Sequence, residues 1–431
     1  ACGIPFFTQQ VVHGTELLED AREVGSLQGG AHLQLVRRPA DPSAGCLLIE
    51  PALAGDAATV EGILRRAADP NFERAEDHAT ALVACSLHGH ADVVQLLCRA
   101  RADAGAVKSG HPIPLYIAAS QGHEEVVSLL CGAGADKDMT VRSGTTPLSA
   151  AARLGHLEVV RWLCSHHADL ERPRRDDGAT PLIAACQGGH VDVVRVLCES
   201  RAELDSVEHS GATAINIASQ KGHFQVVRYL CEVGADKDQA RIDSATPLLM
   251  ACQKGYLEVV KALVESGAQK DKAAQQGATP LYLAAQNGHL EVVKYLYEAG
   301  ARRDVPLYDG SMPLFIASSG GHLDVVQYLL ETGADHDAAN RGGATPFFVA
   351  SQNGHLPVVR QLLAARADQD SLRQDDASPL NMACQSGHLD VVRFLVEAGA
   401  DRDKPDVTGA SPLSNASANG HEEVVQYLRG L

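Results

Sequence analysis

The sequence predicts an all-α fold in which short helical hairpins stack into a solenoid. A Gly-His pair recurs every 33 residues, with one step of 34 between Gly155 and Gly189 and with Gly255-Tyr256 in place of one pair. A Thr-Pro-Leu tripeptide, or a close variant, lies nine residues before most of these glycines, and a Val-Val pair follows each of them. A fixed period of this length is typical of repeat proteins, in which each repeat packs only against its neighbours.

One repeat, residues 142–174, shows why two helices are expected. Thr146 is a suitable N-cap, and Pro147 suits the first helical turn, where a missing N–H costs nothing. Gly155 is placed to end this helix in the left-handed conformation. The polar stretch after Ala168-Asp169 is expected to form a β-hairpin that leads to the next repeat. A second helix between them is indicated by apolar residues at helical spacing, namely Val159, Val160, Leu163 and Cys164.

The repeat resembles the ankyrin repeat in its period, its Thr-Pro-Leu tripeptide and its order of elements. Eleven such repeats would cover residues 77–431, and residues 41–76 would form a degenerate capping repeat whose first helix is interrupted by Pro51. In the family, a histidine after Thr-Pro-Leu ties neighbouring repeats together through a hydrogen bond. This sequence has no histidine at that position, so the resemblance implies looser joints between its repeats. The residues at that position are Val83, Tyr116, Ser149, Ile183, Asn216, Leu249, Tyr282, Phe315, Phe348, Asn381 and Ser414.

Residues 1–40 lack the repeat and carry a different resemblance. Short strands are expected at Gln10–Val12 and at Leu33–Arg37, the second of which alternates apolar and polar residues. The order Ile-Pro, Gln-Gln, short strand, Leu-Glu-Asp and a last strand ending in basic residues resembles the C-terminal half of a ubiquitin-like β-grasp domain. The resemblance implies that the first hairpin and the helix of such a domain precede Ala1. An irregular extension packed on the capping repeat is the alternative.

Composition argues against nucleic acid and membranes as partners. The chain has 37 Lys+Arg against 54 Asp+Glu, a net charge of -17, and its basic residues are interleaved with acidic ones. Such a surface repels phosphate backbones and anionic lipids. No apolar run approaches the roughly 18 residues of a membrane span, so we expect no direct membrane insertion.

The 11 cysteines are expected to be free thiols. Equivalent positions in stacked helices lie about 8–10 Å apart, which exceeds the roughly 7 Å limit for a disulfide. No Cys-x-x-Cys spacing suggests zinc. Free thiols favour an intracellular, reducing compartment, most simply the cytoplasm. Five of the cysteines share one repeat position: Cys98, Cys131, Cys164, Cys198 and Cys231.

No catalytic, metal or cofactor motif is found. The ten repeated histidines would stand about 8–10 Å apart, too far to share a metal ion. We expect them instead to open the second helices and to bond to neighbouring backbone. The sequence contains no Gly-x-Ser-x-Gly, His-Glu-x-x-His or kinase signature.

The repeat positions that vary are the candidates for partner binding. The ankyrin resemblance implies that the hairpin tips and the exposed end of the first helix line a concave groove that contacts proteins. Glutamine recurs along the first helices and would supply hydrogen-bond donors and acceptors. Two hairpins, residues 171–177 and 302–309, break the uniformity and contain Arg and Tyr, which are enriched at binding hot spots. The predicted contact residues are Arg174, Arg175, Asp176, Asp177, Gln187, His209, Gln220, Lys221, Ile242, Asp243, Gln253, Lys254, Gln286, Asn287, Arg302, Arg303, Tyr308, Asp309, Arg341, Gln352, Asn353 and Gln385.

The sequence therefore predicts a non-catalytic scaffold, without a cofactor, that binds one or more proteins and could be a subunit of a larger assembly. Duplicated solvated glutamines and tolerated loop irregularities would explain the same residues without any partner. Two other functions stay open. One is an adaptor in a ubiquitin or proteasome pathway. The other is the ankyrin portion of a larger enzyme or channel, because Val424, Val425 and Leu428 form an ordinary internal helix rather than a polar cap.

Overall fold

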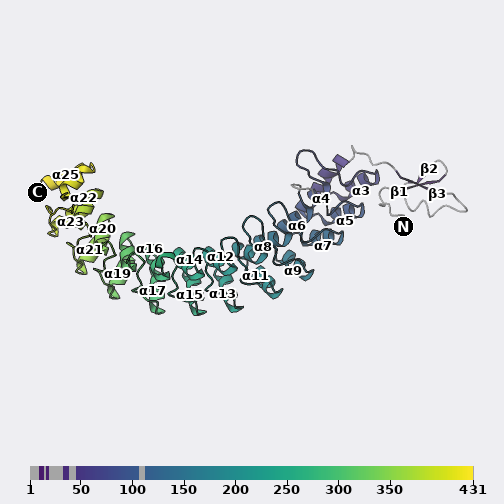
Figure 1. The fold of residues 1–431 in the computed structure, drawn as a ribbon. Coiled ribbons are helices and arrows are strands. Elements are labelled where there is room, and N and C mark those ends of the chain that lie inside the picture. The colour runs from purple at the N-terminus through teal and green to yellow at the C-terminus, as the bar shows by residue number, and fades with distance from the viewer. Residues whose placement is uncertain (1–8, 14–15, 19–32, 38–44, 106–111, 431) are drawn as a thin grey trace. The chain divides into compact units, whose positions relative to one another are not determined.

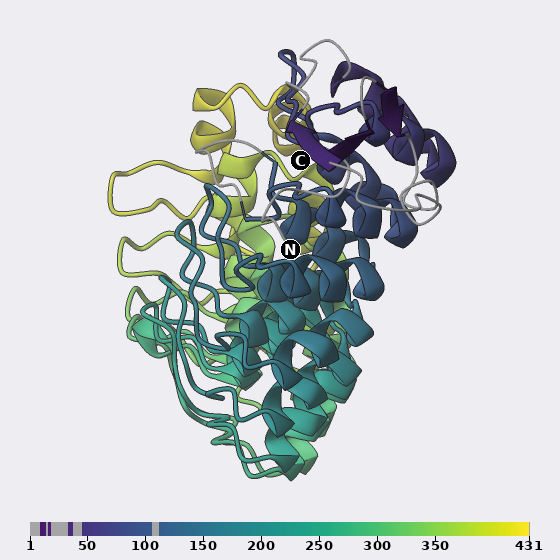
Figure 2. The same cartoon turned by 90° about the vertical axis from the view of Figure 1, so that its right-hand side faces the viewer.

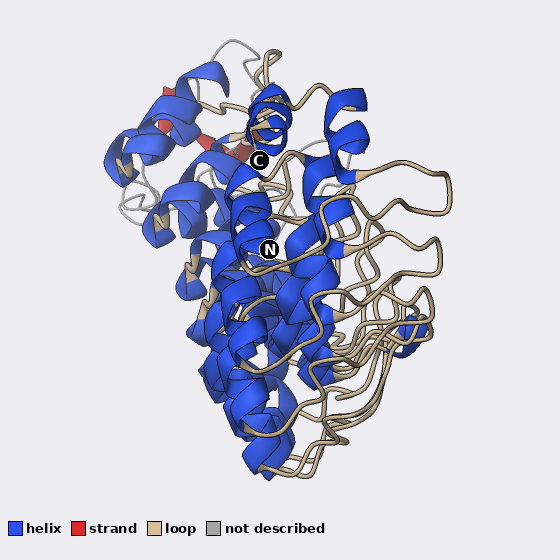
Figure 3. Ribbon diagram, turned by 90° about the vertical axis from the view of Figure 1, so that its left-hand side faces the viewer, coloured by secondary structure: helices blue, strands red, loops and turns tan. Residues whose placement is uncertain are grey.

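The fold is described by a computed structural model for residues 9–13, 16–18, 33–37, 45–105 and 112–430 (Figure 1). The chain divides into two compact units, Ala1–His209 and Ser210–Leu431. Both units are built from pairs of short helices joined by long loops (Figure 3). We call each loop between one repeat's second helix and the next repeat's first helix a finger.

Three short strands form an antiparallel sheet in the first unit. β1 (Gln9–His13) pairs with both β2 (Glu16–Leu18) and β3 (Leu33–Arg37), so the strand order is β2-β1-β3. β1 contains the range Gln10–Val12, and β3 has the bounds that the sequence indicated for the last strand.

The helical part of the first unit begins with the capping repeat. Pro51 was predicted to interrupt the first helix of this repeat, and that prediction is wrong. Pro51 lies in the first turn of α2, where the missing N–H would have no helical acceptor, so the helix continues through it. The helices of this unit are η2 (Gly45–Leu48), α2 (Ile49–Ala54), α3 (Ala57–Arg65), α4 (Ala81–His88), α5 (Ala91–Arg99), α6 (Pro114–Gln121), α7 (Glu124–Gly132), α8 (Pro147–Leu154), α9 (Leu157–Ser165), α10 (Pro181–Gly188) and α11 (Val191–Glu199).

The second unit repeats the same pair of helices. Its helices are α12 (Ala214–Lys221), α13 (Phe224–Glu232), α14 (Pro247–Lys254), α15 (Leu257–Glu265), η3 (Gln275–Gly277), α16 (Pro280–Gln286), α17 (Leu290–Glu298), α18 (Pro313–Ser319), α19 (Leu323–Glu331), α20 (Pro346–Gln352), α21 (Leu356–Ala364), α22 (Pro379–Ser386), α23 (Leu389–Glu397), α24 (Pro412–Ala418) and α25 (Glu422–Arg429).

Local sequence signals set the helix ends as predicted. Thr146 Oγ1 accepts a hydrogen bond from the Ser149 N–H at 3.0 Å, and Pro147 occupies the first turn of α8. Gly155 then ends the helix with a φ of 81°, a conformation that favours glycine. The same Thr-Pro start is found in α10, α14, α16 and α20.

Small side chains let the first helices of successive repeats pack closely, for example α8 against α10 and α12 against α14. From α4 to α22, one position in the first helices is fully buried and holds only Ala, Ser or Cys, whereas its counterpart in α24, Ser417, is exposed. In chain order the buried members are Ser86, Ala119, Ala152, Cys186, Ser219, Cys252, Ala285, Ser318, Ser351 and Cys384. The prediction that small residues occupy the helix contacts is therefore confirmed.

Eight of the ten repeated histidines tie their repeat to the one before it. His156 Nε2 lies 2.9 Å from the Ser120 carbonyl oxygen, and His355 Nε2 lies 3.0 Å from that of Ser319. Each ring also covers a glycine; a Cβ on Gly321 would come within 2.6 Å of His355 Nδ1. The predicted structural role of these histidines is confirmed. The same contact to the preceding repeat is made by His90, His123, His190, His289, His322 and His421.

The fingers are not β-hairpins, contrary to the prediction. No strand is found in the fingers among residues 45–105 and 112–430. Neighbouring fingers instead share single backbone bonds. The Arg341 N–H donates to Asp309 O at 2.7 Å, and the Val407 N–H donates to Asp375 O at 2.9 Å. One such bond aligns two fingers but does not provide the successive bonds of a strand pair.

Candidate partner-binding surface

In each unit the fingers extend to one side of the helix pairs (Figure 2). We define the finger tip as the residue whose N–H donates to the preceding finger, or the residue at the same repeat position. The finger base is the stretch that directly follows the second helix. The first-helix end is the last turn of the first helix. The predicted contact residues lie at these three places or within two residues of them.

In the first unit, the finger with the inserted residue is held together by its own side chains. The Arg174 guanidinium forks onto the Asp177 carboxylate, and its Nη2 donates to Gln187 Oε1 at 3.0 Å. The Arg174 side chain is only 14% exposed. These three predicted contact residues therefore stabilise the finger. The predicted residues left exposed here are Arg175, Asp176 and His209.

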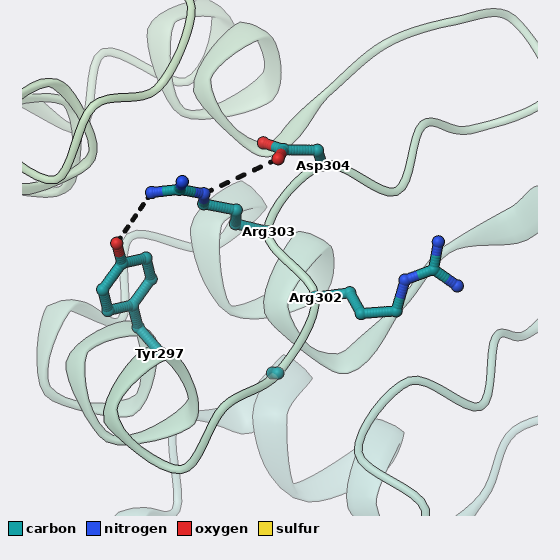
Figure 4. Close-up of a pocket in the computed structure, with 5 residues that line it drawn as sticks. Tyr297, Arg302, Arg303 and Asp304 are labelled. Carbon is teal, nitrogen blue, oxygen red and sulfur yellow. Dashed lines mark hydrogen bonds and ion pairs between the residues drawn. The ribbon is translucent and has the colours of Figure 1, made fainter.

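In the second unit, a polar cleft lies at the base of one finger (Figure 4). Arg303 is engaged within the protein, since its Nη1 donates to Tyr297 Oη at 2.8 Å and to Thr332 O at 2.7 Å. Arg302 extends away from Arg303 and is exposed. Of the two predicted arginines, Arg303 joins two repeats and Arg302 is accessible. The cleft has a volume of about 500 Å³ and is lined by Tyr297, Ala301, Arg302, Arg303 and Asp304.

The position of Arg303 has a repeated structural role that sequence reasoning missed. One repeat earlier, Lys270 Nζ donates to Ala299 O. Two repeats later, Gln369 Nε2 donates to Ala398 O at 3.3 Å. Both acceptors are C-caps of second helices in the next repeat, where the helix dipole favours a positive group. The signal for this role was the 33-residue spacing of the polar donors.

The finger tips of the second unit expose large side chains. Ile242 is 74% exposed and Tyr308 is 68% exposed, and Arg341 is exposed as well. Val407, which is 66% exposed, shares their repeat position and was missed. Counting from Tyr308 in steps of one repeat would have found it.

Two predicted aspartates lie beside these tips and are partly used within their own fingers. Asp243 Oδ1 accepts the Ala245 N–H at 3.1 Å, and Asp243 lies 3.5 Å from the Arg241 guanidinium. Asp309 accepts both the N–H and the hydroxyl of Ser311 at 2.9 Å. These bonds fix the turn at each tip; Asp309 leaves a negative charge beside Tyr308, whereas the charge of Asp243 beside Ile242 is balanced by Arg241.

The first-helix ends carry the predicted glutamines. The side chains of Gln253, Gln286 and Gln385 are exposed, whereas Gln220 and Gln352 are half-buried. The main-chain carbonyls of the three exposed glutamines accept the histidines of the next repeat. Their side-chain amides make no hydrogen bond within the described part of the chain.

The residues after these glutamines differ in availability. Lys221 and Lys254 are exposed cations. Asn287 Nδ2 donates to Leu283 O of its own helix at 2.8 Å, and Asn353 Nδ2 donates to Ser319 O at 2.9 Å. Of the residues that follow the glutamines, the two lysines are therefore more accessible to a partner than the two asparagines.

Arg–Asp pairs within fingers are the main electrostatic feature of the surface. The Arg373 guanidinium forks onto Asp375 and lowers the pKa of that carboxyl to about 2. Arg74 holds the pKa of Asp77 at about 2 in the same way. These pairs keep their carboxylates charged while neutralising the finger locally.

A family model for ankyrin repeats, spanning three copies of the repeat, matches most of the chain. The matched residues are 48–141, 82–174, 170–241, 235–306, 300–371 and 347–430. The chain belongs to the ankyrin repeat family. The matches begin at residue 48, so strands β1 to β3 receive no family assignment, and the ubiquitin-like resemblance stays a prediction. The comparison with curated proteins gave no match.

Ankyrin repeats are in general protein–protein interaction modules and are typically non-catalytic. Within residues 45–105 and 112–430, no group of three or more His, Cys, Asp or Glu residues is placed to hold a metal ion. None of the described helices is long and apolar enough to span a bilayer.

Proposed function

We propose that this ankyrin repeat protein is a non-catalytic scaffold that binds a partner protein across its finger tips and first-helix ends. The observation that carries the proposal is the exposure of Ile242 and Tyr308 on fingers whose backbones are hydrogen-bonded to their neighbours. The free amides of Gln253 and Gln286 lie in the same unit and repeat in the same register. Partner contacts are expected at these groups rather than at Arg174 or Arg303, which are bonded internally.

Affinity capture with matched variants tests this function. The bait is the 431-residue chain, compared with a surface variant that combines Gln253→Ala, Gln286→Ala and Tyr308→Ala. A control variant, Gln225→Ala with Gln426→Ala, removes exposed amides from second helices instead. We expect proteins that are retained by the wild type and the control but lost by the surface variant. Equal retention by all three baits would contradict the proposal.

A second candidate is an adaptor in a ubiquitin or proteasome pathway. It is supported by the antiparallel sheet β2-β1-β3, which coincides with the segment that resembles a ubiquitin-like domain. Capture of proteasome subunits that requires residues 1–40 would favour this function. Capture that survives deletion of those residues would leave the ankyrin surface as the binding site.

We also propose a reducing, intracellular location. The described cysteines are all free thiols, and several of them are fully buried. Accumulation of a tagged chain in the secretory pathway would contradict this proposal.

A further inference from the structure

The finger tips of the second unit occupy one repeat position and form a row, which we call the tip row. Its members occur at one position of the 33-residue repeat: Ile242, Gln275, Tyr308, Arg341, Gln374 and Val407. The N–H groups of Tyr308, Arg341, Gln374 and Val407 each donate to the preceding finger at 2.7 to 3.0 Å. Ile242 makes the same contact to Ser210 O at 3.1 Å.

Three members of the tip row present large apolar side chains to solvent. Ile242, Tyr308 and Val407 are 74%, 68% and 66% exposed, which are the three largest exposures among the large hydrophobic residues of the described chain. No packing within the unit requires apolar residues there, because Gln275 and Gln374 occupy the same position. The backbone bonds hold these side chains in place before binding, which reduces the entropy lost when a partner docks.

Carboxylates flank all three apolar tips. Asp243 follows Ile242 and Asp309 follows Tyr308, while Asp406 precedes Val407. Arg241, which precedes Ile242, and Arg373, which precedes Gln374, are paired in their own fingers with Asp243 at 3.5 Å and with Asp375. The carboxylates beside apolar tips that have no ion pair within the described residues are therefore Asp309 and Asp406.

Arg341 is the exception in the tip row, because its guanidinium is exposed and has no ion pair within the described residues. The other members of the tip row are apolar or neutral, and unpaired carboxylates lie beside Tyr308 and Val407. A complementary partner would place one carboxylate or polar group opposite Arg341 and basic groups elsewhere. The chain's net charge of -17 likewise favours a positively charged partner.

The repeat spacing sets the length of the partner segment. From Ile242 to Val407 the tip row spans five repeat steps. At about 8–10 Å for each step, the distance is on the order of 45 Å, which an extended chain covers with roughly 14 residues.

We infer that the tip row binds an extended segment of a partner protein in which apolar residues are interspersed with Lys or Arg. This inference rests on the proposed scaffold function and names the chemistry of its partner. The apolar side chains of the segment cover Ile242, Tyr308 and Val407, and its cations lie against the flanking carboxylates.

The test uses three fluorescent peptides of about 16 residues and the full chain. The first peptide repeats Leu-Ser-Lys-Ser, the second replaces Lys with Glu, and the third replaces Leu with Ser. Binding is measured by fluorescence anisotropy. The tip variant combines Ile242→Ser, Tyr308→Ser and Val407→Ser. The control variant, Leu47→Ser with Val233→Ser, removes other exposed apolar side chains, which are 60% and 38% exposed.

We expect the Leu-Lys peptide to bind the wild type and the control alike, and to bind the tip variant at least about tenfold more weakly. The Leu-Glu and Ser-Lys peptides should also bind the wild type at least about tenfold more weakly than the Leu-Lys peptide does. Equal binding of the Leu-Lys peptide to wild type and tip variant would overturn the inference. So would tighter binding of the Leu-Glu peptide.

Two further outcomes separate this inference from the proposed function. Partner capture that depends on Gln253 and Gln286 but persists in the tip variant would overturn the tip row and leave a scaffold that binds through its first-helix ends alone. Concentration-dependent dimerisation of the wild type, abolished in the tip variant, would assign the row to a second copy of the chain. That result would also overturn the inference.

Discussion

Two buried asparagines replace the histidine that is missing after Thr-Pro-Leu. Asn216 Oδ1 accepts the Thr213 N–H at 2.9 Å, and Asn216 Nδ2 donates to Gln239 O in the next finger at 3.2 Å. Asn381 accepts the Ser378 hydroxyl at 3.3 Å and donates to Ala410 O at 3.5 Å. The expectation of looser joints is therefore wrong at these two repeats. An amide can supply both an acceptor and a donor, as a neutral imidazole does.

The Asn216→Ala variant should be less stable by about 1–3 kcal/mol, because it leaves the Gln239 carbonyl and the Thr213 cap without a buried partner. Urea unfolding followed by circular dichroism measures the change. The Gln253→Ala variant, at an exposed position, serves as the control and should stay within about 0.5 kcal/mol of the wild type. Equal stability of the two variants would show that the Asn216 bonds contribute nothing.

Asp375 should make stability depend on pH in the acid range. The Arg373 hydrogen bond lowers the pKa of Asp375 from 3.8 to about 2, so the folded chain binds fewer protons than the unfolded chain between these values. The pair therefore stabilises the fold above about pH 4, and this contribution is lost as pH falls toward 2. Thermal unfolding at several pH values should show a steeper acid loss for wild type than for the Asp375→Asn variant. Equal acid loss in the wild type and the Asp375→Asn variant would show that the Arg373–Asp375 pair does not contribute to stability.

At the scale of the element, the boundaries of the helices could be predicted and the fingers could not. A Thr-Pro start and a Gly end are local signals, so Pro147 and Gly155 bound α8 as expected. A finger is shaped by its neighbour, through bonds such as that from Arg341 to Asp309, and these partners lie one repeat away in sequence.

The candidate surface was also predicted only in part, because some of its contacts are local in sequence and others join residues far apart in the chain. Exposure of Ile242 and Tyr308 follows from their place at a polar turn. The internal roles of Arg174 and Arg303 depend on Gln187 and Thr332, which no local pattern connects to them. Val407 was missed because it follows Asp406 in a finger with no unusual sequence, although its repeat position matches that of Tyr308.

The contact between a histidine and the glycine of the preceding repeat should contribute to the stability of each joint between repeats. Gly321 has a φ of 72°, and a Cβ there would come within 2.6 Å of His355. Gly333 has a φ of 87°, but a Cβ there would meet nothing within 4 Å. Both Gly→Ala variants carry the backbone cost of a positive φ, roughly 1 kcal/mol, and only Gly321→Ala must also displace the ring.

We therefore expect Gly321→Ala to lower the free energy of unfolding by at least about 1 kcal/mol more than Gly333→Ala does. Urea unfolding measures both variants, and hydrogen exchange of α18 and α20 would locate the effect. Equal losses would mean that the ring shifts freely and that the histidine joint is weak.

At the scale of the whole molecule, the buried cysteines should make the fold sensitive to alkali. Partial burial raises the pKa of Cys131 and Cys198 to about 11, and the buried Cys384 has a pKa raised to about 12. Burial also raises the pKa of Cys186 and Cys252. A raised pKa means that the folded chain retains protons that the unfolded chain loses above about pH 9. Stability is therefore unaffected below pH 9 and falls as pH rises through the folded pKa values.

Each buried thiol should contribute a loss of up to about 1.4 kcal/mol for each pH unit above 9. Urea unfolding between pH 8 and 11 measures the slope for the wild type and for a double variant, Cys252→Ala with Cys384→Ala. Alanine fits this position, because Ala152 and Ala285 occupy it in other repeats with no exposure. The double variant should fold at pH 8 and lose stability more slowly above pH 9. An unchanged slope would show that these thiols ionise as readily in the folded chain as in the unfolded one, and the loss would then belong to other groups such as Tyr282, whose pKa burial raises to about 12.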